Sequence, residues 1–168
     1  MAGRVTEARA VFRPLAAVWR VHGALPEAWD VLAGRAVGFA KDSPLRPELA
    51  ESAYALAVAT GDGVYAAHAA SMLDAIEDRH RVKCGYAALA DVAESHLDDR
   101  MDSFFLSETA SYLFLTFDSQ LRRRAVDASG PDEARQALML AGRDRTGRGS
   151  LGSLFSGARG GPAAGSAL

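Results

Sequence analysis

Two glutamates, Glu48 and Glu51, stand three residues apart in the first turns of a predicted helix, so their side chains point to the same side. Paired carboxylates suit glycoside hydrolysis, in which one acid protonates the leaving oxygen and a base activates water. Acidic residues at a helix N-terminus also complement the helix dipole, typically by about 0.3–1 kcal/mol. Arg46, just before them, could equally be a surface charge. The spacing by itself favours this second, structural interpretation.

A third glutamate, Glu108, lies four residues after Phe104 and four before Tyr112, within an apolar stripe of a predicted helix over residues 100–117. The opposite side of that helix is also apolar, which is typical of a helix buried on all sides. A carboxylate in such a stripe is costly unless it is paired or faces a wet polar cavity. From these residues we expect a buried ion pair to Arg46 or Arg100 rather than a site residue.

Other chemistry is weakly supported. The four histidines show no metal-ligand spacing, and the single cysteine, Cys84, excludes an internal disulfide and a multi-cysteine zinc site. We expect Cys84 to be a small buried side chain rather than a nucleophile. A net charge of −2 and a pI near 6.1 argue against a nucleic-acid-binding protein. The longest uncharged run, residues 63–73, is too short to span a bilayer, which excludes a transmembrane protein.

The elements that would position these residues are predicted to be helices in succession, which makes the fold all-α. The first predicted helix runs from about residue 5 to 21 and stops at Gly23, with an apolar face formed by Val11, Leu15, Val18 and Trp19. Pro47 sets up the second, which ends at Gly61, and Asp62 caps the third. An irregular piece over residues 82–91 precedes the helix at 100–117.

The C-terminal part differs in composition. Eight of the 16 glycines lie between Gly142 and Leu168, so residues 142–168 offer little apolar surface to offset their ordering entropy. We therefore predict a folded part over residues 1–118, a linker over residues 119–141 with one weak helix from residue 131 to 141, and a disordered Gly-rich tail.

Three ordered motifs give the chain a family resemblance over about residues 12–118. They are PLRPELAES at 44–52, RVKCGYA at 81–87 and DRMDSFFLSET at 99–109. Together they resemble glycoside hydrolase family 47, the class I α-1,2-mannosidases. The KCGY stretch at 83–86, with Trp19 and HGALPE at 22–27, is most similar to the branch of ER degradation-enhancing α-mannosidase-like proteins.

The resemblance implies an (α/α)7 barrel of paired antiparallel helices, whose inner helices end at a sugar-binding cavity. It implies that Glu48 is the general base, that Arg46 contacts the mannose and that Phe104 packs on the sugar ring. Glu51 and Glu108 would hold the sugar and, with Glu48, the waters around a bound calcium. The family reaction inverts the anomeric carbon, which requires about 6.5–9.5 Å between the two carboxyl groups.

The implied substrate is terminal α-1,2-linked mannose on the high-mannose N-glycans of misfolded glycoproteins. The implied setting is the lumen of the endoplasmic reticulum, where trimming leads to degradation, although no signal peptide is visible near Met1.

The sequence also departs from the family pattern. The general acid and a second essential aspartate lie upstream in the family, in a region that this chain does not contain. The Thr-Glu-Ala-His motif that binds calcium directly is absent, because the only threonine after Thr116 is Thr146. We therefore expect a C-terminal part of the catalytic barrel that is poorly stable or associating by itself, with no first-shell metal ligand and little or no hydrolysis.

Two alternatives stay open. One is a non-catalytic protein that binds mannose glycans or a quality-control partner through part of the pocket. The other is a helical-hairpin scaffold in the cytosol, which is consistent with the missing signal sequence.

Overall fold

The structure is a computed structural model that describes residues 3–94 and 96–128. The chain divides into two units, residues 1–125 and 126–168, and only residues 126–128 of the second are described. The predicted helix at 131–141 and the disorder predicted over 142–168 therefore lie outside the described residues.

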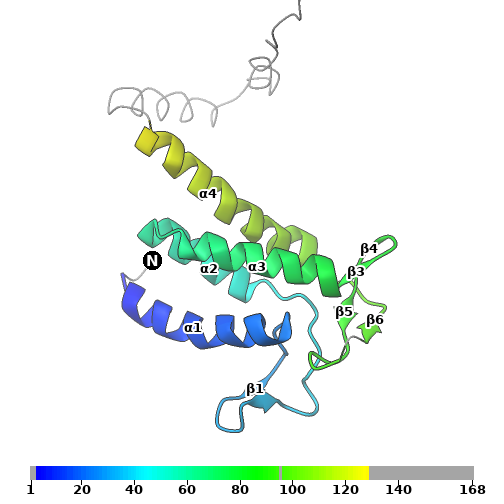
Figure 1. The fold of residues 1–168 in the computed structure, drawn as a ribbon. Helices are drawn as coiled ribbons and strands as arrows, with labels where there is room; N and C mark the ends of the chain where they lie inside the picture. The colour runs from blue at the N-terminus through cyan, green and yellow to red at the C-terminus, as the bar shows by residue number, and fades with distance from the viewer. Residues whose placement is uncertain (1–2, 95, 129–168) are drawn as a thin grey trace, which may run out of the picture. The chain divides into compact units, whose positions relative to one another are not determined.

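The first unit is mainly helical, which confirms the all-α prediction (Figure 1). Its main elements are α1 (Val5–His22), α2 (Glu48–Thr60), α3 (Val64–Arg79), the π-helical turn η1 (Phe105–Thr109) and α4 (Ala110–Ala128). Among the described residues, no helix is long and apolar enough to cross a membrane.

Helix α1 ends where the sequence predicts, because Gly23 adopts a left-handed conformation with φ of 62° and its N–H donates to the Trp19 carbonyl. Its predicted apolar face is partly wrong. The residues that it buries are Phe12, Ala16 and Trp19, whereas Val11 is 65% exposed. The reason is that α1 packs on both α2 and α3, so residues spaced by three and four along Phe12–Trp19 face that pair, and Val11 is left at its side.

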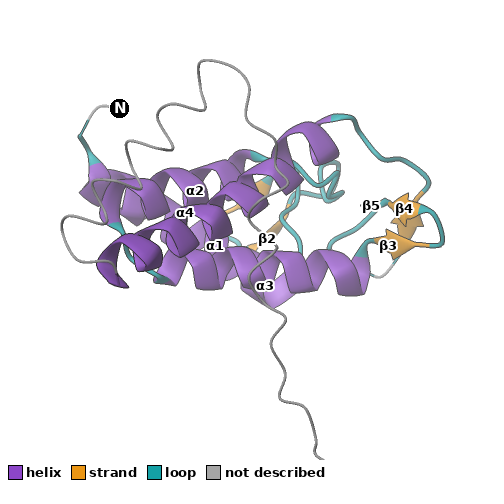
Figure 2. Ribbon diagram, turned by 90° about the horizontal axis from the view of Figure 1, so that it is seen from above, coloured by secondary structure: helices purple, strands orange, loops and turns teal. Residues whose placement is uncertain are grey.

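Helices α2 and α3 form the predicted pair with a short connection, which makes them antiparallel neighbours (Figure 2). Gly61 closes α2 with φ of 70°. The Val64 N–H donates to Asp62 Oδ1 at 3.0 Å, but the N-cap residue of α3 is Gly63, one position after the predicted Asp62. The pair buries one continuous row of mainly small and apolar side chains: Leu49, Ala50, Ala53, Leu56 and Ala57 of α2, with Tyr65, Ala69, Met72 and Ile76 of α3.

Three short antiparallel strand pairs lie in the segments that connect the helices. They are β1 (Trp29–Asp30) with β2 (Arg35–Ala36), β3 (Arg81–Val82) with β4 (Gly85–Tyr86), and β5 (Ala88–Leu89) with β6 (Leu97–Asp98). The stretch predicted to be irregular thus contains a hairpin. Cys84 lies in its turn and is exposed, so the prediction of a buried cysteine is wrong. The ring of Tyr86 packs on Phe105 at 5.0 Å between centroids, which supports η1.

The last helix begins later and ends later than predicted. Arg100 pairs with three acidic side chains, Asp42, Asp98 and Asp102, which holds residues 99–102 in an irregular conformation. The helical part then starts near Phe104, passes through η1 and continues to Ala128. Its predicted burial on all sides is also wrong, because Phe114 is 66% exposed. The ring of Tyr112 packs 6.1 Å from that of Tyr54, which places α4 along α2.

Candidate functional site

The loop before α2 is held in an unusual conformation. Leu45 is the one non-glycine residue in the described part of the chain with a positive φ, of 65°, and it is 1% exposed. The Thr109 hydroxyl donates a hydrogen bond of 2.6 Å to the Leu45 carbonyl oxygen. On the other side, Ser43 and Leu89 exchange two backbone hydrogen bonds of 2.8 and 3.0 Å. These hydrogen bonds hold in place the backbone that directly precedes Arg46.

Arg46 lies against Phe104, a contact that was not predicted from the sequence. The guanidinium carbon is 5.4 Å from the centre of the Phe104 ring, which is a cation–π distance. Nε of Arg46 donates to Glu27 Oε1 at 2.5 Å, and the side chain of Arg46 is half exposed. This hydrogen bond, with the negative charges of Glu27, Glu48 and Asp102, raises the pKa of Arg46. The structure thus brings Arg46, Phe104 and Glu48 to one neighbourhood.

The negative charges of Glu51 and Glu108 both act on the hydroxyl of Tyr112. The negative charge of Glu51, followed by burial, the charge of Glu108 and a hydrogen bond to Glu51, raises the pKa of Tyr112. Both carboxylates are exposed. The second half of the predicted site is therefore an acidic pair with a phenol between α2 and the start of α4.

The ion pair expected for Glu108 is not formed. Arg46 pairs with Glu27, and Arg100 pairs with aspartates. The prediction that Glu108 is buried is wrong. The η1 turn directs Phe105 and Thr109 inward, at 4% and 2% exposure, and leaves Glu108 exposed to water. An exposed carboxylate needs no ionic partner, because water solvates it.

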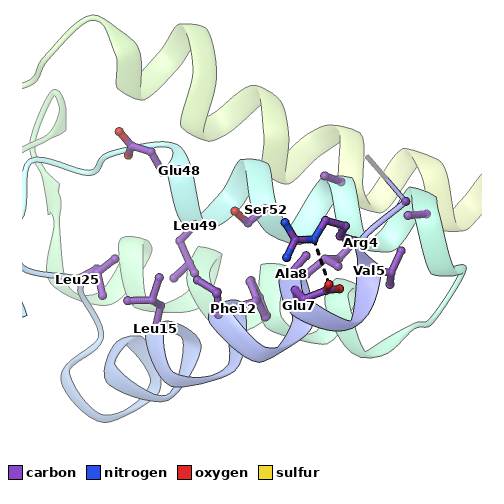
Figure 3. A pocket seen from close by; sticks show the side chains of 15 residues that line it. Arg4, Val5, Glu7, Ala8, Phe12, Leu15, Leu25, Glu48, Leu49 and Ser52 are labelled. Carbon is purple, nitrogen blue, oxygen red and sulfur yellow. Dashed lines mark hydrogen bonds and ion pairs between the residues drawn. The ribbon is translucent and has the colours of Figure 1, made fainter. Parts of the chain in front are cut away.

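Glu48 is the first residue of α2 and borders a groove of about 760 Å³ between α1 and α2 (Figure 3). Figure 3 shows its carboxylate pointing away from α1. The groove is lined mainly by apolar side chains, among them Val5, Val11, Phe12, Leu15, Leu25, Leu49 and Leu56. Of the five predicted site residues, only Glu48 lines it. The other four lie on the open surface beside η1, so the groove is not the sugar site that they would form.

A metal centre is not formed by the described residues alone. Within residues 3–94 and 96–128, no group of three or more His, Cys, Asp and Glu side chains is arranged to hold a metal ion. The calcium implied by the resemblance does not fit these residues as a first coordination shell.

Four residues of this neighbourhood were not predicted from the sequence. Glu27 belongs to the HGALPE motif, which predicts no role for its side chain, and the spacing of Tyr112 predicts only a place in the apolar stripe. The spacing of Tyr112, four residues after Glu108, is the signal that could have paired them. Nothing in the sequence indicates the contact between Leu45 and Thr109, which are 64 residues apart.

The chain is similar to known glycosyl hydrolases over the residues that carry this site. Residues 3–127 match the family described as Glycosyl hydrolase family 47. The chain is 40% identical over 116 residues to "ER degradation-enhancing alpha-mannosidase-like protein 2" of Homo sapiens, covering 69% of this chain and 20% of the relative. It is 36% identical over 132 residues to "Alpha-mannosidase I MNS4" of Arabidopsis thaliana, covering 78% and 21%.

A solved structure, that of alpha-1,2-mannosidase from Trichoderma reesei, is 34% identical in sequence, with a TM-score of 0.47. The similarity covers 56% of this chain and 21% of that chain. The chain spans about a fifth of the length of the two curated relatives named above.

Proposed function

Because the chain belongs to glycosyl hydrolase family 47, we propose that the open surface beside η1 binds terminal α-1,2-linked mannose of high-mannose N-glycans. Its helix pairs would form part of the family's (α/α)7 barrel. The relatives named for ER degradation suggest the lumen of the endoplasmic reticulum and the disposal of misfolded glycoproteins as the setting. The observation that carries the proposal is the contact between Arg46 and Phe104 beside Glu48.

Each residue has a role that its contacts support. The Phe104 ring offers an apolar face for the C–H side of a pyranose, and the half-exposed Arg46 has donors left for sugar hydroxyls. Glu27 holds the guanidinium in place. Glu51 and Glu108 would accept hydrogen bonds from further hydroxyls or ordered waters.

In the hydrolytic reaction, Glu48 would be the general base. As an exposed carboxylate at the start of α2, it can accept a proton from the attacking water while an acid on the other face protonates the leaving oxygen. Inversion requires about 6.5–9.5 Å between the two groups. We propose that this acid comes from another part of a complete family domain, so these residues by themselves bind sugar and hydrolyse little.

Calcium remains part of the proposal in a limited form. Glu48, Glu51 and Glu108 would accept hydrogen bonds from waters around the ion, whose direct ligands would come from elsewhere. A calcium titration of the full chain should then give no saturable binding below millimolar concentration. Tight calcium binding by this chain would contradict this assignment.

Binding is tested by titrating the full chain with α-1,2-mannobiose. We expect Phe104→Ala to weaken binding by about tenfold, since aromatic contacts contribute about 0.5–1.5 kcal/mol beyond burial. The matched control is Phe114→Ala, which removes an exposed ring from α4 away from the predicted contacts and should leave the affinity unchanged. Absence of binding at millimolar mannobiose, or equal loss in both variants, would contradict the proposal.

A second candidate function is glycan binding without hydrolysis. It is favoured by the same open surface, which joins an aromatic ring and an arginine. The one proposed catalytic group, the neighbouring Glu48, has no assigned acid. The two functions differ in the effect of Glu48→Gln. A binding protein keeps its biological effect in that variant, whereas a hydrolase loses it.

A further inference from the structure

We infer that Thr109 is a positioning residue, whose hydroxyl holds the Leu45–Arg46 peptide and thereby fixes the guanidinium of Arg46 on the ring of Phe104. The expected effect of Thr109 on sugar binding rests on the proposed function. Its expected effect on the position of Arg46 does not.

The first support is the conformation of Leu45. A left-handed φ is rare for a branched residue such as leucine and persists only when the surroundings hold it. It lets the chain bury the Leu45 side chain in the core while the next residue, Arg46, is exposed. A relaxed backbone at this point would turn Arg46 away from its present direction.

The second support is the geometry of the hydrogen bond. Thr109 is 2% exposed, and its 2.6 Å bond joins two segments that carry all five predicted site residues. Leu45 directly precedes Arg46, and Thr109 is the last residue of η1, directly after Glu108. No other side-chain hydrogen bond found among residues 3–94 and 96–128 joins the loop before α2 to η1.

The third support is the π-helical turn. The Ala110 N–H donates to Phe105 five residues back, rather than to Leu106 as in an α-helix. This wider turn places Thr109 inward, toward Leu45, while Glu108 stays on the surface. Such turns are rare and occur frequently at functional sites.

The chain offers a matched control for a purely structural role. Thr116 is also fully buried, and its hydroxyl donates at 2.8 Å to the Tyr112 carbonyl of its own helix. Thr116→Val therefore removes a buried threonine hydroxyl without touching Leu45. Thr109→Val removes the link, and Thr109→Ser retains it.

The experiment is side-chain NMR of the labelled full chain. In the wild type, ring current from Phe104 should shift the Arg46 δ-protons upfield, and Phe104→Ala sets the unshifted reference. We expect Thr109→Val to move these signals most of the way to that reference, whereas Thr109→Ser and Thr116→Val keep the wild-type shift. Folded Thr109→Val with wild-type Arg46 signals would overturn the inference.

Affinity for α-1,2-mannobiose is the second readout. We expect about tenfold weaker binding for Thr109→Val and less than twofold change for Thr109→Ser. If the wild type binds no mannobiose, the proposed function fails, while the Arg46 signals still decide the role of Thr109. Thr109→Ala, which is smaller, replaces valine if that variant does not fold. If neither folds, the Thr109 hydroxyl proton in the wild type decides: protection from exchange supports the link, and rapid exchange overturns it.

Discussion

The two open surfaces beside α2 differ in chemistry. Toward α1 lies the groove of about 760 Å³, whose lining is mainly aliphatic. Toward η1 lies the surface of Arg46, Phe104, Glu51 and Glu108, where charged groups are solvated and one aromatic ring is half-buried. The groove offers apolar side chains, which favour contact with another apolar group. The second surface offers polar groups, which can exchange bound water for sugar hydroxyls. The apolar groove is therefore not the better candidate for a carbohydrate site.

The largest effect expected from this difference is on hydrolysis. Residues 3–127 of this chain would replace the matching segment of the Arabidopsis thaliana mannosidase, which supplies the rest of a family domain. Glu48→Gln in that chimera should lower mannose release by about 10²–10⁴-fold, because the attacking water loses its base. Glu7→Gln, an exposed carboxylate on the groove side, is the control and should hydrolyse as the parent does.

An equal rate for Glu48→Gln and its parent chimera would show that Glu48 is not the base. A parent chimera that binds mannoside but does not hydrolyse it would favour the binding function.

The next effect concerns stability and separates the core from the groove. Met72→Ala removes a side chain that is 2% exposed and should lower the free energy of unfolding by about 2–5 kcal/mol. Leu15→Ala removes a groove side chain that is 37% exposed and should lower it by less than about 1 kcal/mol. Urea unfolding measures both. Equal losses would mean that the groove is covered in solution, for example by association of chains.

The sequence predicted the helices well where a local signal ends them. Gly23 and Gly61 adopt left-handed conformations that stop α1 and α2 as expected. The start of the last helix was wrong, because Arg100 binds the acidic run that composition alone would read as a helix start. The buried face of α1 was partly wrong, because two neighbouring helices, rather than one, decide which side is covered.

For the site, the residue types came from family resemblance, and the contacts came from the structure. Local spacing favoured a buried ion pair for Glu108, and the π-helical turn that leaves it exposed has no signal in composition. The contacts of Glu27 and Thr109 join residues 19 and 64 positions away, respectively, beyond the reach of any local pattern.

A smaller effect is expected from pH, through a buried histidine at the end of α3. Burial lowers the pKa of His80, whose Nδ1 lies 2.9 Å from the Ala87 carbonyl oxygen. Because the unfolded chain then binds the proton more readily, stability is full above about pH 6.5 and falls as the pH drops below it, by at most about 1.4 kcal/mol per pH unit.

Urea unfolding at pH 7.5 and 5.5 measures this loss, and His80→Gln should reduce it. His96→Gln, at an exposed position, is the control. The same pH dependence in both variants would rule out His80 as its source.

The smallest expected effect is that of Glu27→Gln. This substitution removes the charge that pairs with Arg46 and leaves the guanidinium in place. Exposed ion pairs contribute about 0.2–1 kcal/mol. Mannobiose affinity should fall by at most about fivefold. Lys41→Gln breaks the comparably exposed pair with Asp91 and should leave the affinity unchanged. A loss above tenfold for Glu27→Gln would mean that Glu27 itself contacts the sugar.

The most direct measurement is an amide and side-chain NMR map of the full chain at increasing α-1,2-mannobiose concentration. The predicted result is saturable shift changes at Arg46, Phe104 and Tyr112, with the groove residues Val11 and Leu15 unaffected. Changes confined to the groove, or no saturable change at millimolar sugar, would contradict the assignment of the open surface beside η1 as the mannose site.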